Sequence, residues 1–211
     1  FLTNEKIAEK IAKSANLSKG DNVLEIGPGR GILTKYLVKF AEKVLAVEID
    51  SKLVIALQKY NEAKVIKGNI LEINLPKLIE ENIFRNYKVV ANLPYYITSK
   101  IIRLFLETKL PPSEMTLMVQ KEVGERIAAP GGKESILSIS VKFYADPEIL
   151  FDVPRENFSP VPEVDSTVIK IKRKTHTPKA DMNKFFSLVR AGFSSKRKMI
   201  VNNLSSSFHA P

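Results

Sequence analysis

Asn92, Leu93, Pro94 and Tyr95 follow a short apolar run, and their residue types suit them to hold a flat amine. The exocyclic amine of a nucleobase is a poor nucleophile because its lone pair is delocalised into the ring. The Asn92 side-chain oxygen and the Leu93 carbonyl are acceptors that could draw the amine hydrogens out of the ring plane. Pro94 would stiffen the loop, and Tyr95 could stack on the base. The alternative to amine binding, for so short a segment, is a structural role in which Pro94 ends the strand and Tyr95 fills space in the core.

A glycine-rich turn lies upstream, at Gly27, Gly29 and Gly31, between an apolar segment and a helical one. This order places backbone N–H groups around a ligand beyond the carboxyl ends of parallel strands. The spacing is G-x-G-x-G, which differs from the G-x-G-x-x-G of dinucleotide binders. Glu48 lies 21 residues after Gly27, where a carboxylate can accept from both hydroxyls of a ribose. Nucleoside binding is therefore favoured over a purely structural turn.

Short apolar segments alternate with amphipathic ones, which predicts an α/β fold with a parallel, doubly wound sheet. Strands are expected over 23–26, 44–49, 65–66, 88–91 and 115–119, and helices over 7–15, 33–40, 51–57, 75–83 and 99–106. Farther along, the pattern predicts helices over 121–129 and 135–144, then strands over 149–153 and 167–171. A direct connection makes this last strand pair antiparallel, at one edge of the sheet. After Pro178 the apolar spacing predicts one more helix.

The composition bounds the class of protein. The chain has 211 residues, of which 44% are hydrophobic, so it can bury a proper core. It has no cysteine and only two histidines, and we expect no disulfide and no metal site. It has no apolar run long enough for a membrane span and no signal-peptide pattern. We expect a soluble, cytoplasmic monomer.

Positive charge is concentrated near the C-terminal end. The net charge is +10, but residues 1–169 hold 23 Lys and Arg against 22 Asp and Glu, whereas residues 170–198 hold 10 against one. Such a cluster is either a solvated tail or a surface that docks a polyanion. Because it adjoins a segment of balanced charge, we favour a surface that docks a polyanion.

Several motifs occur together in this chain: Glu25 to Gly31 with Leu33-Thr34, Glu48, Asn92 to Tyr95, and Phe158 to Ser166. Together they resemble the S-adenosylmethionine-dependent ribosomal RNA adenine dimethyltransferases, from Phe1-Leu2 through Arg197. The resemblance implies a Rossmann-like methyltransferase domain over 1–174 with a mostly parallel sheet and an antiparallel edge strand. It also implies that 175–211 begins a truncated, basic, helical C-terminal domain.

The resemblance implies S-adenosylmethionine as the cofactor. Gly27 and its neighbours would hold the methionine part, Glu48 the ribose, and Asn69 with Ile70 the adenine. The implied cofactor residues are Leu2, Glu25, Gly27, Gly29, Gly31, Glu48, Ile49, Asn69, Ile70 and Asn92. Leu2 matches the end of the family's N-terminal Gln-Asn-Phe-Leu element. Asn69 stands where the family usually has Asp, which predicts weaker binding; without the resemblance, Asn69 is an ordinary turn residue.

The resemblance also implies a catalytic set and a nucleic-acid surface. The catalytic residues would be Asn92, Leu93, Pro94, Tyr95 and Phe158, with the base held between Tyr95 and Phe158. Taken alone, Phe158 is better explained as a core residue. The candidate RNA-binding residues are Lys172, Arg173, Lys174, Lys196, Arg197 and Lys198.

Two branches of this family modify different RNAs. Leu93 and Val164-Asp165-Ser166 look like the branch that dimethylates two adjacent adenosines in a hairpin loop near the 3′ end of small-subunit rRNA. The expected partner is that rRNA or a pre-assembled small ribosomal subunit. The alternatives are a large-subunit methyltransferase of the macrolide-resistance type, a non-catalytic ribosome-assembly factor, and a methyltransferase acting on DNA or a small molecule.

Overall fold

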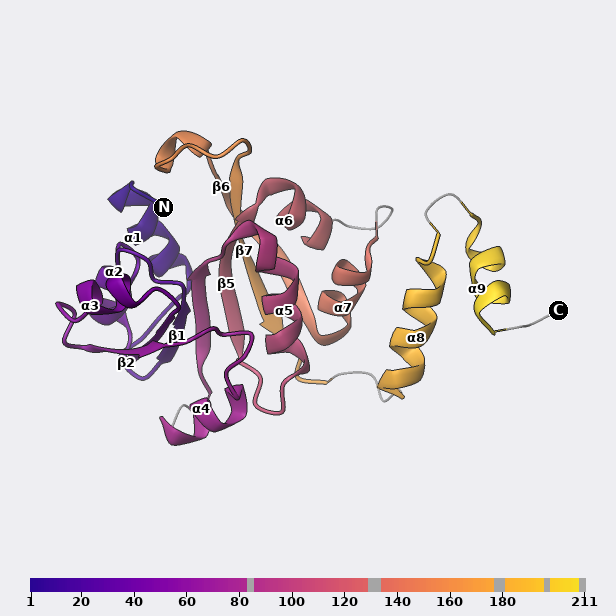
Figure 1. Ribbon diagram of the computed structural model, residues 1–211, viewed down its shortest axis with the longest axis horizontal. Coiled ribbons are helices and arrows are strands. Elements are labelled where there is room, and N and C mark those ends of the chain that lie inside the picture. The colour runs from indigo at the N-terminus through magenta and orange to yellow at the C-terminus, as the bar shows by residue number, and fades with distance from the viewer. Residues whose placement is uncertain (83–85, 129–133, 177–180, 196–197, 209–211) are drawn as a thin grey trace.

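Figure 1 shows the computed structural model of the chain, which describes residues 1–82, 86–128, 134–176, 181–195 and 198–208. Its centre is a seven-stranded sheet with the strand order β3-β2-β1-β4-β5-β7-β6. The strands are β1 (Asn22–Ile26), β2 (Lys43–Glu48), β3 (Ala63–Lys67), β4 (Lys88–Asn92), β5 (Glu114–Gln120), β6 (Ala145–Val153) and β7 (Ser166–Arg173). The α-helices are α1 (Glu5–Ser14), α2 (Thr34–Phe40), α3 (Ser51–Leu57), α4 (Leu75–Glu81), α5 (Thr98–Glu107), α6 (Lys121–Ala128), α7 (Ile136–Tyr144), α8 (Met182–Gly192) and α9 (Ile200–Phe208), and the 3-10 turns are η1 (Tyr95–Ile97) and η2 (Arg155–Asn157).

The strand pairing brings the functional loops to one edge of the sheet. Strands β3, β2, β1, β4 and β5 are parallel to their neighbours, whereas β7 is antiparallel to both β5 and β6. This confirms the predicted mostly parallel sheet with an antiparallel edge. The chain winds outward from β1 to β3 and then returns to β4 beside β1. A ligand crevice forms where the winding reverses in this way, outside the carboxyl ends of the strands.

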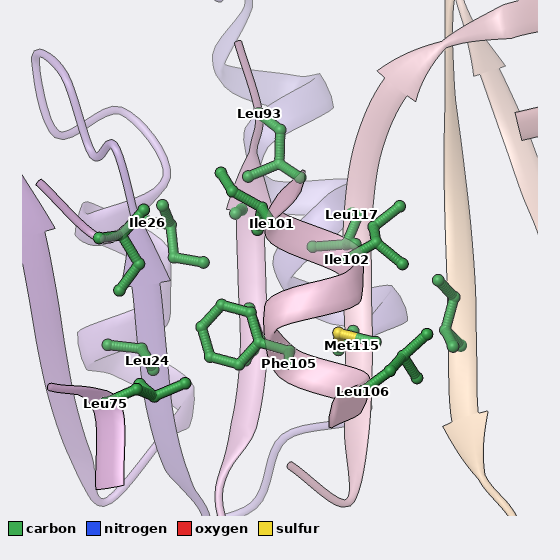
Figure 2. Packing of buried hydrophobic residues seen from close by; sticks show 14 of the residues in the cluster. Leu24, Ile26, Leu75, Leu93, Ile101, Ile102, Phe105, Leu106, Met115 and Leu117 are labelled. Atoms are coloured by element: carbon green, nitrogen blue, oxygen red, sulfur yellow. The ribbon is translucent and has the colours of Figure 1, made fainter. Parts of the chain in front are cut away.

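Each central strand contributes to apolar cores on both faces of the sheet, because successive side chains point to opposite sides. In β4, Val89 and Ala91 belong to one cluster and Val90 belongs to the other. Figure 2 shows the first cluster, in which Phe105 and its neighbours on α5 pack over the strands. On the other face, α1 and α2 cover the second cluster. The strands that carry the site are therefore packed between two layers of helices.

Two elements differ from the sequence prediction. Strand β6 begins at Ala145, not at Ile149, and includes Pro147. Proline is tolerated there because β6 is the edge strand, where one side of the backbone has no ladder to complete. Helix α9 follows the single predicted C-terminal helix; its Asn- and Ser-rich sequence has weak helix propensity. Packing on α8 supports it, and the Asn203 amide donates to the carbonyls of Gly192 and Ser195 at 2.9 and 3.0 Å.

The C-terminal helices are joined to the rest of the protein by aromatic contacts. The Phe143 and Phe185 rings lie 4.6 Å apart between centroids, and Tyr144 stacks on Phe186 at 6.2 Å. Figure 1 shows α8 beside α7 and α9 beyond it. A domain boundary near residue 174 stays a prediction. Within the described residues, no helix is both long and apolar enough to cross a membrane.

Candidate active site

The glycine-rich loop between β1 and α2 has a backbone that glycine alone adopts readily. Gly27, Gly29 and Gly31 have φ angles of 62°, 58° and 80°. The Gly27 N–H donates to the Val47 carbonyl (2.9 Å), which ties the loop to the end of β2. At Gly31 a Cβ atom would lie 2.4 Å from the Tyr60 ring, so both the angle and the space require glycine. The structure therefore shows a loop whose shape requires glycine, and its contact with a ligand stays a prediction.

Glu48 is held against that loop. It ends β2, is 5% exposed, and its Oε2 accepts from the Gly29 N–H at 3.0 Å. Its Oε1 accepts from the N–H groups of Ile49 and Asp50 at 2.8 and 3.0 Å. The carboxylate thus lies next to the loop, where a ribose acceptor is expected. Ile49 is 65% exposed beside it and offers apolar surface to a flat ring.

Glu25 is a second buried carboxyl group behind the loop. Its Oε2 accepts from the Thr34 hydroxyl at 2.7 Å. Burial raises the pKa of Glu25 to about 8, the Thr34 hydrogen bond opposes this rise, and the nearby Glu48 charge adds to it. Near neutral pH Glu25 therefore keeps its proton, so Glu48 is the carboxylate of this loop that can attract a cationic ligand.

Asn69 and Ile70 lie in the turn after β3. The Asn69 Oδ1 accepts from the Leu71 N–H at 3.1 Å, and its amide donates to Glu72 Oε1 at 2.7 Å. Ile70 is buried in the core, so its backbone is the part available to a ligand. The structure gives Asn69 the turn role that the sequence left open, and a contact of Asn69 with adenine stays a prediction.

The loop after β4 presents two acceptors that the protein itself does not use. Leu93 is 2% exposed and its side chain packs over α5 beside Ile101 (Figure 2). The Leu93 N–H donates to the Met118 carbonyl at 3.2 Å, which fixes the peptide in place. The Pro94 carbonyl accepts from the Ile97 N–H at 3.2 Å. Throughout the described residues, neither the Asn92 side-chain amide nor the Leu93 carbonyl has a protein partner. They are therefore available to bind a substrate amine.

Tyr95 is oriented from across the sheet. Its hydroxyl shares a hydrogen bond of 2.8 Å with the hydroxyl of Ser166, the first residue of β7. Ser166 is fully buried, so this contact sets the tilt of the Tyr95 ring. We did not assign Ser166 a role from the sequence. The sequence marked Ser166 only as part of the Val164-Asp165-Ser166 motif. Only the fold shows that Ser166 contacts Tyr95.

The N-terminal segment joins the two sides of the site. The Phe1 ring lies over the glycine-rich loop, where a Cβ atom on Gly29 would be 3.0 Å away from it. Leu2 forms an antiparallel bridge with Phe158, and the Ser159 N–H donates to the Phe1 carbonyl at 2.8 Å. The side chains of Leu2 and Phe158 lie in one core cluster, and Phe158 is 7% exposed. The structure therefore shows the core role of Phe158; its contact with a base stays a prediction.

The predicted RNA-binding residues fall in different places. Lys172, Arg173 and Lys174 lie at the end of β7 farthest from Ser166, so about 20 Å of strand separates them from the Tyr95 contact. The Arg173 guanidinium donates to the Leu106 carbonyl (3.4 Å) and the Lys174 ammonium to the Lys142 carbonyl (2.6 Å), while Lys172 is exposed. Lys198 is exposed beside α9. Lys196 and Arg197 lie outside the described residues.

Methyl transfer to an amine requires a pocket for a cationic donor beside a pocket for the acceptor. Here the glycine-rich loop follows β1, Glu48 ends β2, and the loop with two open acceptors follows β4, the direct neighbour of β1. S-adenosylmethionine, with its ribose hydroxyls and its sulfonium and ammonium charges, suits the Glu48 carboxylate beside the glycine-rich loop. This arrangement defines a Rossmann-like, S-adenosylmethionine-dependent methyltransferase. Within the described residues, no group of three or more His, Cys, Asp or Glu could hold a metal ion.

Comparison with known proteins defines the family. Residues 1–210 match the model of the ribosomal RNA adenine dimethylase family. The ribosomal RNA small subunit methyltransferase A of Alkaliphilus oremlandii is 45% identical over 97% of this chain and 75% of the relative. The chain belongs to the ribosomal RNA adenine dimethylase family, and it is an S-adenosylmethionine-dependent rRNA methyltransferase.

Solved structures agree with this assignment. A dimethyladenosine transferase from Plasmodium falciparum has a TM-score of 0.84 at 32% identity, covering 97% of this chain and 74% of that one. The 23S rRNA methyltransferase ErmE has a TM-score of 0.78 at 27% identity, covering 98% and 84%. One of these neighbours is named as a dimethyladenosine transferase and the other as a 23S rRNA methyltransferase, so fold alone does not select the substrate.

Proposed function

We propose that this enzyme dimethylates the exocyclic N6 amines of two adjacent adenosines in a hairpin loop near the 3′ end of small-subunit rRNA. The names of its relatives at 41–45% identity support the small-subunit target. So do the residues Leu93 and Val164-Asp165-Ser166, which resemble that branch of the family. The observation that carries the chemistry is the pair of open acceptors at Asn92 and Leu93.

In this proposal the two acceptors act on the target amine directly. The Asn92 side-chain oxygen and the Leu93 carbonyl each accept one N6 hydrogen, which turns the nitrogen lone pair out of the ring. Tyr95, held by Ser166, stacks on the flipped base and fixes its angle. When bound, S-adenosylmethionine supplies an activated methyl group on a sulfonium sulfur. With that group bound, Asn92 and the Leu93 carbonyl would hold the N6 nitrogen toward the activated methyl group, and the N6 proton displaced by methylation would leave to water.

The protein's remaining role is to hold donor and acceptor in line, which accounts for much of the rate of such reactions. We assign the methionine part of the cofactor to the glycine-rich loop with Glu25, and the ribose to Glu48. The adenine then lies between Ile49 and the turn at Asn69 and Ile70.

The proposed path of the RNA away from the catalytic loop runs through a cleft. It has a volume of about 820 Å³ and lies between α5, α6 and α7 on one side and the end of α8 on the other. Its charged lining residues are Arg103, Arg126, Lys198 and Glu134, and Arg103 is paired with Glu107. Positive side chains of this kind suit phosphate groups. We propose that the RNA backbone docks here, with the small ribosomal subunit or its rRNA as the partner, the enzyme acting as a monomer in the cytoplasm.

Mapping of methylated nucleotides tests the proposal. Unmodified small subunits, free small-subunit rRNA and free large-subunit rRNA would each be incubated with the protein and isotope-labelled S-adenosylmethionine. We expect two neighbouring N6-dimethyladenosines in the small-subunit samples, detected by mass spectrometry. Methylation confined to large-subunit rRNA would support the macrolide-resistance type of target instead. RNA binding without methyl transfer to any of the three would indicate an assembly factor.

A further inference from the structure

An aromatic ring lies fully open to solvent directly beside the catalytic loop. Tyr96 is 85% exposed, whereas its neighbour Tyr95 is partly buried and hydrogen-bonded to Ser166. Large aromatic side chains are normally at least half buried, because their area dominates the hydrophobic gain. An exposed ring next to a reactive loop therefore needs an explanation.

The backbone under Tyr96 is fixed. Tyr96 is the middle residue of η1, where the Pro94 carbonyl accepts from the Ile97 N–H and from the Thr98 hydroxyl, both at 3.2 Å. Thr98 is itself buried at the start of α5. The ring is therefore presented outward from a rigid turn, which lowers the entropy lost when a partner binds.

The residues that follow Tyr96 lead from the catalytic loop to the basic cleft. Because η1 continues directly into α5, residues three and seven positions after Tyr96 follow it along one side of the helix. These residues are Ser99 and Arg103, and both line the cleft. Lys100, four residues after Tyr96, is exposed and has no ion-pair partner among the described residues. Along this side a π-face comes first, followed by the positive charge of Lys100 and by Arg103, which is paired with Glu107 at 3.0 Å. An aromatic face with positive charge beside it is the combination that binds single-stranded nucleic acid.

We propose that Tyr96 is a stacking platform for the nucleotide next to the target adenosine, and that Lys100 contacts a phosphate beside it. The inference rests on the proposed function, since it requires an RNA strand to enter the catalytic loop. With one adenosine held by Asn92 and Leu93, the strand must turn sharply out of the loop. A base stacked on Tyr96 would hold the flanking strand in that turn.

Steady-state kinetics with unmodified small subunits test the platform. The variants are Tyr96→Ala, which removes the ring, and Tyr96→Phe, which keeps it. Stacking energies measured by alanine substitution correspond to roughly 5- to 150-fold in affinity. We expect Tyr96→Ala to lower kcat/KM by that factor, mainly through KM, and Tyr96→Phe to stay within about twofold of wild type. Cofactor affinity should be the same in all three proteins.

Two controls separate stacking from other effects. Ile55→Ala removes an apolar side chain that is 66% exposed on α3 and should change nothing. Lys100→Gln should lower the slope of log K against log salt by roughly 0.7 to 0.9, while Tyr96→Ala should leave that slope unchanged because the ring is uncharged. Equal kcat/KM for wild type and Tyr96→Ala would overturn the inference alone, as would an equal loss in Tyr96→Phe. Absence of methyl transfer by the wild-type protein would instead overturn the proposed function.

Discussion

Replacing Glu25 with glutamine should change how stability depends on pH. Glu25 is buried behind the glycine-rich loop and burial raises its pKa from 4.5 to about 8. A raised pKa means that the folded protein binds this proton more tightly than the unfolded chain does. The stabilisation from the bound proton is therefore complete below pH 4.5 and is lost as the pH rises through 8. Glutamine keeps an oxygen to accept from Thr34 and does not titrate.

The size of the effect follows from the pKa difference. Each unit corresponds to about 1.4 kcal/mol, so the wild-type protein should lose about 3 kcal/mol from this group between pH 4.5 and 7 and about 5 kcal/mol by pH 9. The Glu25→Gln variant should not show this loss. For a chain of this size, each kcal/mol corresponds to about 2–4 °C, so the difference in Tm between variant and wild type should grow by about 10 °C or more between pH 5 and 9.

Urea unfolding at pH 5, 7 and 9, without cofactor, measures this difference directly. Glu62→Gln is the matched control, because it makes the same substitution at an exposed position without changing a buried group. The free energy of unfolding of Glu25→Gln, relative to wild type, should rise steadily with pH, and that of Glu62→Gln should not. A constant difference across the three pH values would show that Glu25 is ionised in the folded protein, contrary to this reasoning.

Three further substitutions test individual contacts. Gly31→Ala should destabilise the fold by about 2 kcal/mol or more in urea unfolding, because its φ is 80° and a Cβ would clash; Gly20→Ala, with open space around it, should be nearly neutral. Tyr95→Phe and Ser166→Ala should each slow methyl transfer, and the double variant should be no slower than either one, since all remove the same hydrogen bond. Asn203→Ala should cost about 1–2 kcal/mol and speed proteolysis near α9, because two carbonyls at the end of α8 lose their donor.

The alternation of apolar and amphipathic segments was sufficient to predict the sheet. Each parallel strand is short and apolar, and each connecting helix has one apolar face, so the local pattern and the final packing agree. The failures occurred where tertiary contacts override local preference. Strand β6 includes Pro147 because it lies at the edge, and α9 forms from a poor helical sequence because Asn203 and α8 support it.

From the sequence we could predict those features of the candidate site that depend on a residue's own backbone conformation or on its position at the end of a strand. Gly31 needs its φ angle, Glu48 ends a strand, and the acceptors at Asn92 and Leu93 remain open. Pairings between distant residues were not predictable, as with Tyr95 and Ser166, which are 71 residues apart. The use of Asn69 in its own turn likewise depends on side-chain rotamers that no sequence pattern fixes.

Charge counting located a basic segment but not its geometry. Lys172 and Lys198 belong to the same basic cluster in the sequence, but they lie in different places. Lys172 lies near the end of β7 that is far from the catalytic loop, whereas Lys198 lines the cleft beside α5. Net charge is a property of a segment, whereas docking depends on which face of the fold each side chain reaches. The cleft residue Arg126 lies on α6, far from the basic segment in sequence, and no charge run pointed to it.

Single-turnover methyl transfer by Asn92→Ala and Asn92→Asp tests the central claim most directly, namely that two open acceptors on the loop after β4 activate the target amine. The alanine variant should react about 10²- to 10³-fold more slowly than wild type at saturating S-adenosylmethionine and small subunits, because one preorganised acceptor is lost. The aspartate variant keeps an acceptor oxygen and should lose much less, and both should bind the cofactor with nearly wild-type affinity. An alanine variant that turns over within a few-fold of wild type would contradict the account.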